Sequence, residues 1–164
     1  MRILAFDQST RVTGYSIFDD GKYITSGIID LSKIKETSER TRQMGIMICK
    51  KIEEYQPSHI VLEEVQCQGN VDTVKKLARL QGIAIGFAAA NNIPLHILEP
   101  TKWRASLGYK QGPKVDRKAL KQQSLDYVKN NFGFTFSEDR SEAICINEAA
   151  HKIFGWSSDD DWDI

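Results

Sequence analysis

Acidic side chains follow two short apolar runs of the chain. Asp7 comes directly after the run 3–6, and Glu63 and Glu64 come at the end of the run 59–62. Ligands of open α/β sheets bind where strands end. If the two runs are parallel neighbours, one glutamate lies beside Asp7, and only one can, because adjacent strand residues point to opposite faces. Periodicity alone leaves both glutamates open.

A second pair of acids heads the segment 138–154. At 100° per residue, Asp139 and Glu142 share one helical face with an apolar stripe. The stripe consists of Ile146, Ala149, Ala150 and Ile153. Charges on a buried face are costly unless a cation, a metal or hydrogen bonds compensate them, so both acids are expected to point inward to such a partner. The alternative, an outward-facing acid that complements the helix dipole, suits Glu138.

Carboxylates that converge without a set of histidines or cysteines suit a hard cation with oxygen ligands, namely Mg²⁺ or Mn²⁺. Such sites hold two ions about 4 Å apart, which stabilise the attacking and leaving oxygens of a displacement at phosphorus. Phosphodiester hydrolysis is therefore the leading chemistry. Neither the three histidines nor the three cysteines have ligand spacing, so zinc and disulfides are not expected. These residues are His59, His96, His151, Cys49, Cys67 and Cys145.

Basic residues gather in the segment 102–129, which carries eight of them against two acids, although the whole chain has a formal net charge of zero. From residue 136 onward the balance reverses, with two basic residues against eight acidic ones. A basic edge beside an acidic pocket suits a phosphate polymer that lysines hold and metals cut. The candidate DNA-binding residues are Arg104, Lys110, Lys114, Arg117 and Lys118.

The elements that must position these residues fit one α/β domain. The chain has 164 residues, 41% of them hydrophobic, so a single domain over 1–156 is expected, followed by an acidic tail at 157–164 that is expected to be a frayed end. Apolar patterning predicts strands at 3–6, 12–18, 23–29, 59–62 and 94–98, and helices at 36–55, 70–91, 100–107, 115–131 and 138–154. This order predicts a five-stranded mixed sheet, an antiparallel meander plus two parallel strands, with helices on both faces.

Two further features bear on partners and location. Gly82, Gly86 and Ala90 recur every four residues and leave one side of a long helix without bulk, so either the sheet or a second copy of the helix should pack there. The longest stretch without strongly polar residues, 82–90, is too short to span a bilayer. The N-terminus shows no secretion signal, so a cytoplasmic location is expected.

Four segments in order resemble motifs of the RuvC Holliday-junction resolvases of the RNase H-like superfamily. Residues 6–15, Phe-Asp-Gln-Ser-Thr-Arg-Val-Thr-Gly-Tyr, resemble the first motif, and 62–65, Leu-Glu-Glu-Val, resemble the second. Asn70 and 76–85 are similar to the long helix of the family. Residues 139–143 resemble its last motif, with Glu142 in place of the second aspartate.

The resemblance implies an RNase H-like fold and selects Glu63 over Glu64. It implies a homodimer that nicks opposing strands of four-way junctions, and also of forks or flaps. In this reading Asp7 bridges two Mg²⁺ ions, for which Mn²⁺ can substitute, Glu63 completes one site, and Asp139 with Glu142 completes the other. Gln66 stands where the bacterial enzymes carry an aromatic wedge, and either Arg117 or Lys118 matches a lysine of their basic loop. These departures resemble phage-encoded relatives.

Two other functions compete with this interpretation. Residues 7–10, followed by a hairpin, also resemble the phosphate loop of sugar kinases and actin-like ATPases, which predicts a nucleotide phosphotransferase. Those enzymes need two such lobes, which 164 residues can hardly supply. A junction-binding protein without catalysis is the third class, and the intact carboxylates argue against it.

Overall fold

A computed structural model describes residues 1–66 and 70–156, and this part of the chain forms five strands and five helices. The strands are β1 (Arg2–Asp7), β2 (Val12–Asp19), β3 (Lys22–Asp30), β4 (His59–Glu63) and β5 (Leu95–Leu98). The helices are α1 (Thr37–Tyr55), α2 (Val71–Ala90), α3 (Pro100–Ser106), α4 (Arg117–Phe132) and α5 (Glu138–Phe154).

The strands form one sheet in the order β3-β2-β1-β4-β5. The first three strands pair antiparallel, whereas β4 runs parallel to β1, and β5 runs parallel to β4. This confirms the predicted mixed sheet. Phe6 lies opposite Leu62 in the parallel register, so the ends of β1 and β4 bring Asp7 and Glu63 to the same edge.

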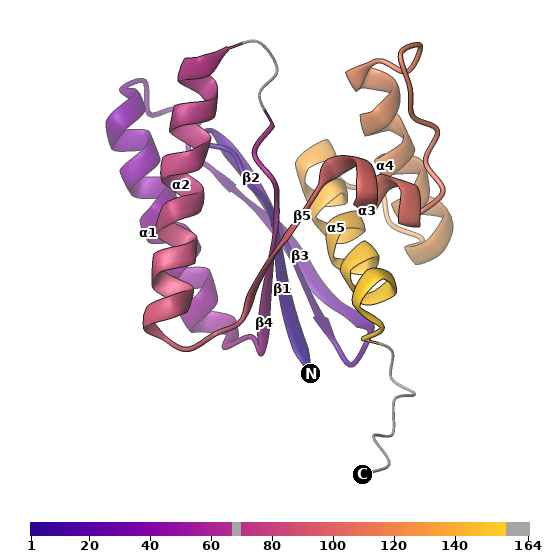
Figure 1. Ribbon diagram of the computed structural model, residues 1–164, viewed down its shortest axis with the longest axis horizontal. Coiled ribbons are helices and arrows are strands. Elements are labelled where there is room, and N and C mark those ends of the chain that lie inside the picture. The colour runs from indigo at the N-terminus through magenta and orange to yellow at the C-terminus, as the bar shows by residue number, and fades with distance from the viewer. Residues whose placement is uncertain (67–69, 157–164) are drawn as a thin grey trace.

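Helices cover both faces of the sheet (Figure 1). On one face α1 and α2 pack over a core that contains Leu4, Phe6 and Ile60. On the other face α5 lies against β1 and β2, with α3 and α4 outside it, over a core that contains Phe18 and Trp103. Four consecutive residues of β1 are buried: Ile3 and Ala5 belong to one core, and Leu4 and Phe6 belong to the other, because successive strand residues point to opposite faces.

Side-chain caps fix where several helices begin. The carboxylate of Asp116 accepts the backbone N–H of Ala119 over 2.7 Å, so α4 starts at Arg117 and not at the predicted residue 115. Asn70 caps α2 in the same way, through the N–H groups of Asp72 and Thr73. These caps account for the small differences between predicted and observed helix bounds.

Two sequence expectations about helix faces need revision. A Cβ added to Gly82 or Gly86 would meet no atom within 4 Å, so the sheet does not cover the small-residue side of α2. The other expected occupant, a second copy of the helix, stays a prediction. Ile153 is 40% exposed because the buried part of α5 ends at His151, two residues before the end of the predicted stripe.

Within the described ranges, no helix has both the length and the apolar character that a membrane crossing requires. Cys49 and Cys145 are free thiols. Cys67 and the acidic tail at 157–164 lie outside the described residues.

Candidate active site

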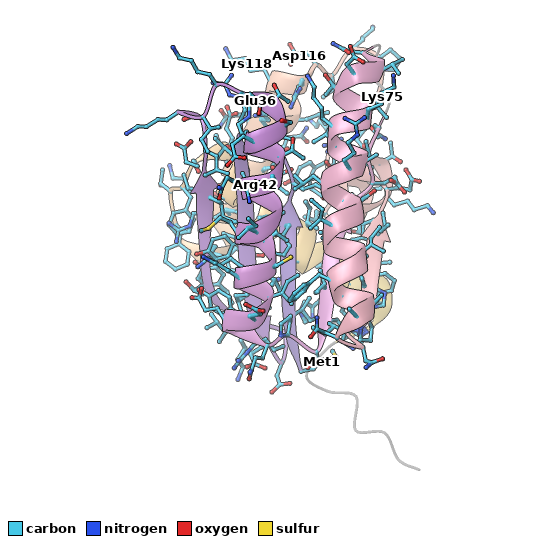
Figure 2. The ribbon with its side chains drawn as sticks, turned by 90° about the vertical axis from the view of Figure 1, so that its left-hand side faces the viewer. Met1, Glu36, Arg42, Lys75, Asp116 and Lys118 are labelled. Atoms are coloured by element: carbon cyan, nitrogen blue, oxygen red, sulfur yellow. The ribbon has the colours of Figure 1, made fainter. Side chains whose placement is uncertain are left out.

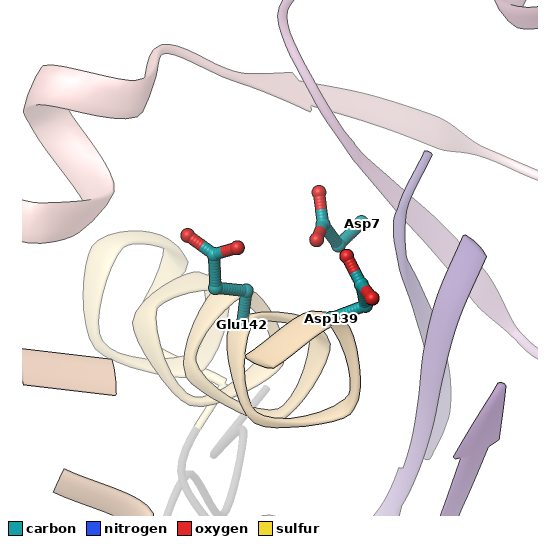
Figure 3. Close-up of side chains that lie close together, drawn as sticks. All are labelled: Asp7, Asp139 and Glu142. Carbon is teal, nitrogen blue, oxygen red and sulfur yellow. The ribbon is translucent and has the colours of Figure 1, made fainter. Parts of the chain in front are cut away.

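Three carboxylates meet where β1 ends and α5 begins. One oxygen each of Asp7, Asp139 and Glu142 can be chosen so that all three lie within 4.8 Å of one another. Figure 3 shows Asp139 and Glu142 rising from the first turns of α5 toward Asp7. The inward face predicted for the two α5 acids is therefore the face that meets β1.

These carboxylates have no compensating donors of their own. Among the described residues, no hydrogen bond or ion pair reaches the side chain of Asp7, Asp139 or Glu142, and Glu142 is only 9% exposed. Burial, together with the charges of Glu142, Glu63 and Asp139, raises the pKa of Asp7 well above its usual range. Burial and the charge of Glu63 raise the pKa of Glu142 to about 7. Such a cluster favours a bound cation, which removes the repulsion among the carboxylates.

Gly14 allows α5 to approach β1 this closely. Gly14 lies opposite Asp7 in the β1–β2 register, and a Cβ there would stand 1.9 Å from the carbonyl oxygen of Asp139. Next to it, the Thr13 hydroxyl donates to the carbonyl of Ser9 over 2.6 Å and accepts the Ser9 N–H over 3.0 Å, which closes the turn after Asp7. The first sequence motif thus both supplies an acid and clears space for a second one.

Glu63 lies in the same cavity but apart from the group of three. Its Oε1 accepts the indole N–H of Trp103 over 2.7 Å and lies 3.4 Å from Nη2 of Arg104. Burial raises the pKa of Glu63, although the Trp103 hydrogen bond and the charge of Arg104 act in the opposite direction. Glu64 also borders the cavity, but its carboxylate turns back to accept the N–H of Val65. The charge of Glu63, and not that of Glu64, acts on Asp7. That only one of the two glutamates joins the site beside Asp7 stays a prediction.

The cavity has a volume of about 780 Å³ and mixed charge. The predicted DNA-binding residues divide here: Arg104 and Arg117 line the cavity, whereas Lys110, Lys114 and Lys118 are exposed outside it. Figure 2 shows Lys118 at the end of the molecule opposite Met1, the end at which the start of α1 also lies. The exposed lysines are therefore placed to extend a basic surface beyond the cavity.

Sequence reasoning missed three further basic residues in this wall, namely Arg11, Arg40 and Lys76. They come from the β1–β2 turn, α1 and α2, so no local charge count could group them. Lys121 of α4, which belongs to the basic segment 102–129, also lines the cavity. Lys121 donates to Glu138 at the start of α5. Burial lowers the pKa of Lys121, but this hydrogen bond and the nearby charges of Glu142 and Asp139 outweigh burial and raise it. Gln66, at the position of the aromatic wedge in the resembled family, is exposed at the cavity rim.

Comparison with known proteins identifies the family. A family model described as "Crossover junction endodeoxyribonuclease RuvC" matches residues 3–135. The chain belongs to the RuvC family. The match ends before α5, so the geometry of the cluster, and not the family model, singles out Asp139 and Glu142.

Individual relatives agree with this assignment. The RuvC crossover junction endodeoxyribonuclease of Hydrogenovibrio crunogenus is 30% identical over 149 residues, which cover 87% of this chain and 83% of the relative. The RuvC crossover junction endodeoxyribonuclease of Methylococcus capsulatus is 34% identical over 98 residues, which cover 58% of this chain and 59% of the relative. The fold matches T. thermophilus RuvC in complex with a Holliday junction substrate, with a TM-score of 0.76 at 13% identity over 96% of this chain and 97% of that one. At this identity the structural likeness shows the fold alone, and it confirms the RNase H-like architecture implied by the sequence motifs.

Proposed function

We propose that this chain is a structure-selective endodeoxyribonuclease that resolves Holliday junctions and other branched DNA by hydrolysis of phosphodiester bonds with a divalent metal. The observation that carries this proposal is the convergence of Asp7, Asp139 and Glu142 within 4.8 Å, without a hydrogen bond or ion pair from the described residues, in a chain of the RuvC family. A kinase-type nucleotide site does not require such a cluster.

The donor set fits Mg²⁺, with Mn²⁺ as a substitute, because all of its ligand atoms are carboxylate oxygens. The charges of Glu63, Asp139 and Glu142 all act on Asp7, so Asp7 would take part in holding both ions, with Glu63 completing one site and Asp139 with Glu142 completing the other. When bound, two such ions stabilise the attacking and leaving oxygens of an in-line displacement at phosphorus. The chain itself orients the carboxylate oxygens of the four acids, which stand at the end of β1, at the end of β4 and in the first turns of α5.

The basic wall of the cavity would hold the DNA backbone. Arg104 and Arg117 contribute from α3 and α4, and Arg11, Arg40 and Lys76 contribute from the opposite side. Lys110, Lys114 and Lys118 would contact phosphates farther from the cut. Contacts of this kind position DNA without reading its sequence.

The chain would act as a homodimer. A Cβ added to Gly82 or Gly86 of α2 would meet no atom of the described residues within 4 Å, and Ile83 and Ile85 on the same helix are 37% and 39% exposed. Small residues on a helix allow a second helix to approach closely. Two active sites related by a twofold axis match the symmetry of a four-way junction. Because the substrate is DNA, we place the enzyme in the cytoplasm, that of the host if a phage encodes it.

The deciding experiment incubates the purified chain with labelled four-way junctions, forks, flaps and linear duplexes, with and without Mg²⁺. We expect Mg²⁺-dependent nicks in branched substrates and little cutting of linear duplex. Asp7→Asn should abolish cleavage but keep junction binding, because it removes a charge without changing the shape of the side chain. Cutting retained by Asp7→Asn would remove this residue from the site.

The same experiment separates the competing functions. Junction binding by the wild-type chain without Mg²⁺-dependent cleavage would favour a non-catalytic binding protein. Tight ATP binding without nuclease activity would favour a phosphotransferase.

A further inference from the structure

The carboxylate of Glu63 is held from one side only. Both donors that reach it come from α3 and converge on the same oxygen, Oε1: the indole N–H of Trp103 at 2.7 Å and Nη2 of Arg104 at 3.4 Å. Among the described residues, none donates a hydrogen bond to Oε2. One oxygen of Glu63 is therefore anchored, and the other is available to a cation.

Trp103 is the firmer of the two anchors. Its side chain is fully buried, and its ring meets that of Tyr109 edge-on with centroids 5.5 Å apart. Arg104 is longer and more flexible, its guanidinium lies 4.9 Å from the Trp103 ring centroid, and its buried Nε has no partner among the described residues. An arginine with a spare donor in a basic wall can turn to a phosphate, whereas the indole cannot leave its pocket.

Indole chemistry restricts what this contact can do. The indole N–H is a donor only, and it neither ionises nor binds a metal. A buried N–H of this kind needs an acceptor, and Glu63 supplies it. Trp103 therefore selects the orientation of the Glu63 carboxylate without competing for the cation. Outer-shell donors that orient a metal-binding carboxylate are worth about 10–100-fold in metal affinity.

We propose that Trp103 is a positioning residue for the metal site: its indole N–H anchors Oε1 of Glu63 and so presents Oε2 to the cation. This rests on the proposed function, in which Glu63 is a metal ligand. The role also explains why the aromatic residue of α3 lies in the core and still donates a hydrogen bond to Glu63, which lines the cavity.

The test measures Mn²⁺ binding to the isolated full chain by titration calorimetry, so that it does not depend on cleavage. Trp103→Phe keeps an aromatic ring in the core and removes the N–H, and we expect it to weaken Mn²⁺ binding about 10–100-fold. Tyr109→Phe is the matched control. It contacts Trp103 and loses hydrogen bonds to Ser124 and Cys145, but it does not reach Glu63, so its Mn²⁺ affinity should equal that of wild type.

A spectroscopic measurement keeps the proposal testable if Trp103→Phe folds poorly. In ¹⁵N-labelled wild-type chain, the Trp103 indole N–H resonance should shift on titration with Mg²⁺. It should also shift in Glu63→Gln, where the anionic acceptor is gone. A resonance that responds to neither would overturn the proposal.

The outcomes separate this inference from the proposed function. Equal Mn²⁺ affinity in wild type and Trp103→Phe overturns the positioning role alone. Failure of the wild-type chain to bind Mn²⁺ overturns the metal-dependent function and, with it, the positioning role.

Discussion

The two ends of the sheet differ in whether their ionisable side chains have hydrogen-bonding partners. At the end where β1 and β4 stop, Asp7, Asp139 and Glu142 crowd together with no donor among the described residues. At the other end His59 and His96 lie with Nδ1 and Nε2 only 3.0 Å apart, in hydrogen-bonding contact. The ring of Trp156 covers both, at centroid distances of 4.8 and 4.9 Å.

The two ends therefore respond oppositely to pH. Burial raises the pKa of Asp7 and Glu142, so the stability from their protonated forms is present at low pH and is lost as pH rises through the raised values, about 7 for Glu142. Burial lowers the pKa of His59 and His96, so the folded state loses stability as pH falls below about 6.5, the ordinary value for histidine.

This difference distinguishes the carboxylate end, a candidate functional site, from the histidine end, an ordinary packed surface. The histidine end pairs two of its ring nitrogens with each other, whereas the carboxylate end carries a repulsion that a proton or a cation can relieve. Stability given up at a cluster of this kind is characteristic of functional sites. The comparison suggests four experiments, in order of decreasing expected effect.

The largest effect should separate the two glutamates at the end of β4. Glu63→Gln removes a proposed metal ligand and should reduce junction cleavage at least about 100-fold, since even outer-shell changes cost about 10–100-fold. Glu64→Gln should leave the rate within about twofold, because the side-chain oxygen of Glu64 accepts the backbone N–H of Val65. Cleavage rates under saturating Mg²⁺ measure both. The reverse result would reassign the ligand to Glu64.

The second effect concerns DNA binding at the carboxylate end. Replacing Lys114, Arg117 and Lys118 together with glutamine should flatten the dependence of junction affinity on salt, because each phosphate contact contributes a slope of about −0.9. Lys22→Gln is the control, since Lys22 is exposed beside the start of β1 at the other end. Affinities measured across a range of salt concentrations test this. An unchanged slope in the triple variant would return these residues to ordinary surface.

Sequence periodicity was enough to place the acids at the ends of their elements. The apolar runs before Asp7 and Glu63 predicted buried strands, and the stripe behind Asp139 and Glu142 predicted which face of the helix turns inward. Both predictions rest on short-range patterns that packing did not override. The parallel pairing of β1 with β4 was only a condition of the sequence argument, and the register of the sheet shows it.

Other parts of the site depend on contacts that no local pattern encodes. Gly14 matters because α5, more than 120 residues later, lies against it, and the sequence shows only a glycine within a strand. The anchor of Glu63 comes from Trp103, whose aromatic type predicted only a core position. The basic wall formed by Arg11, Arg40 and Lys76 joins three separate elements, so counting charges along the chain could not reveal it.

The third effect is on stability at the carboxylate end. Glu142→Gln keeps the shape of the side chain and removes its charge, so without divalent ions it should stabilise the fold at pH 8 by on the order of 1 kcal/mol, or about 2–4 °C in a domain of this size. At pH 5, where Glu142 is already protonated, the gain should largely disappear. Thermal unfolding with a chelator across this range measures it. A gain that does not vary with pH would show that the charge of Glu142 is not the cause.

The smallest effect should appear at the histidine end. His96→Gln retains a hydrogen-bonding side chain but cannot titrate, so it should lose less stability than wild type between pH 7 and pH 5, with only a modest difference because both histidines are partly exposed. The same melts measure this, and junction cleavage at pH 8 should stay within about twofold of wild type. A large loss of cleavage in His96→Gln would mean that the two ends are coupled through β4 and β5, and the contrast between a functional site and an ordinary packed surface would no longer hold.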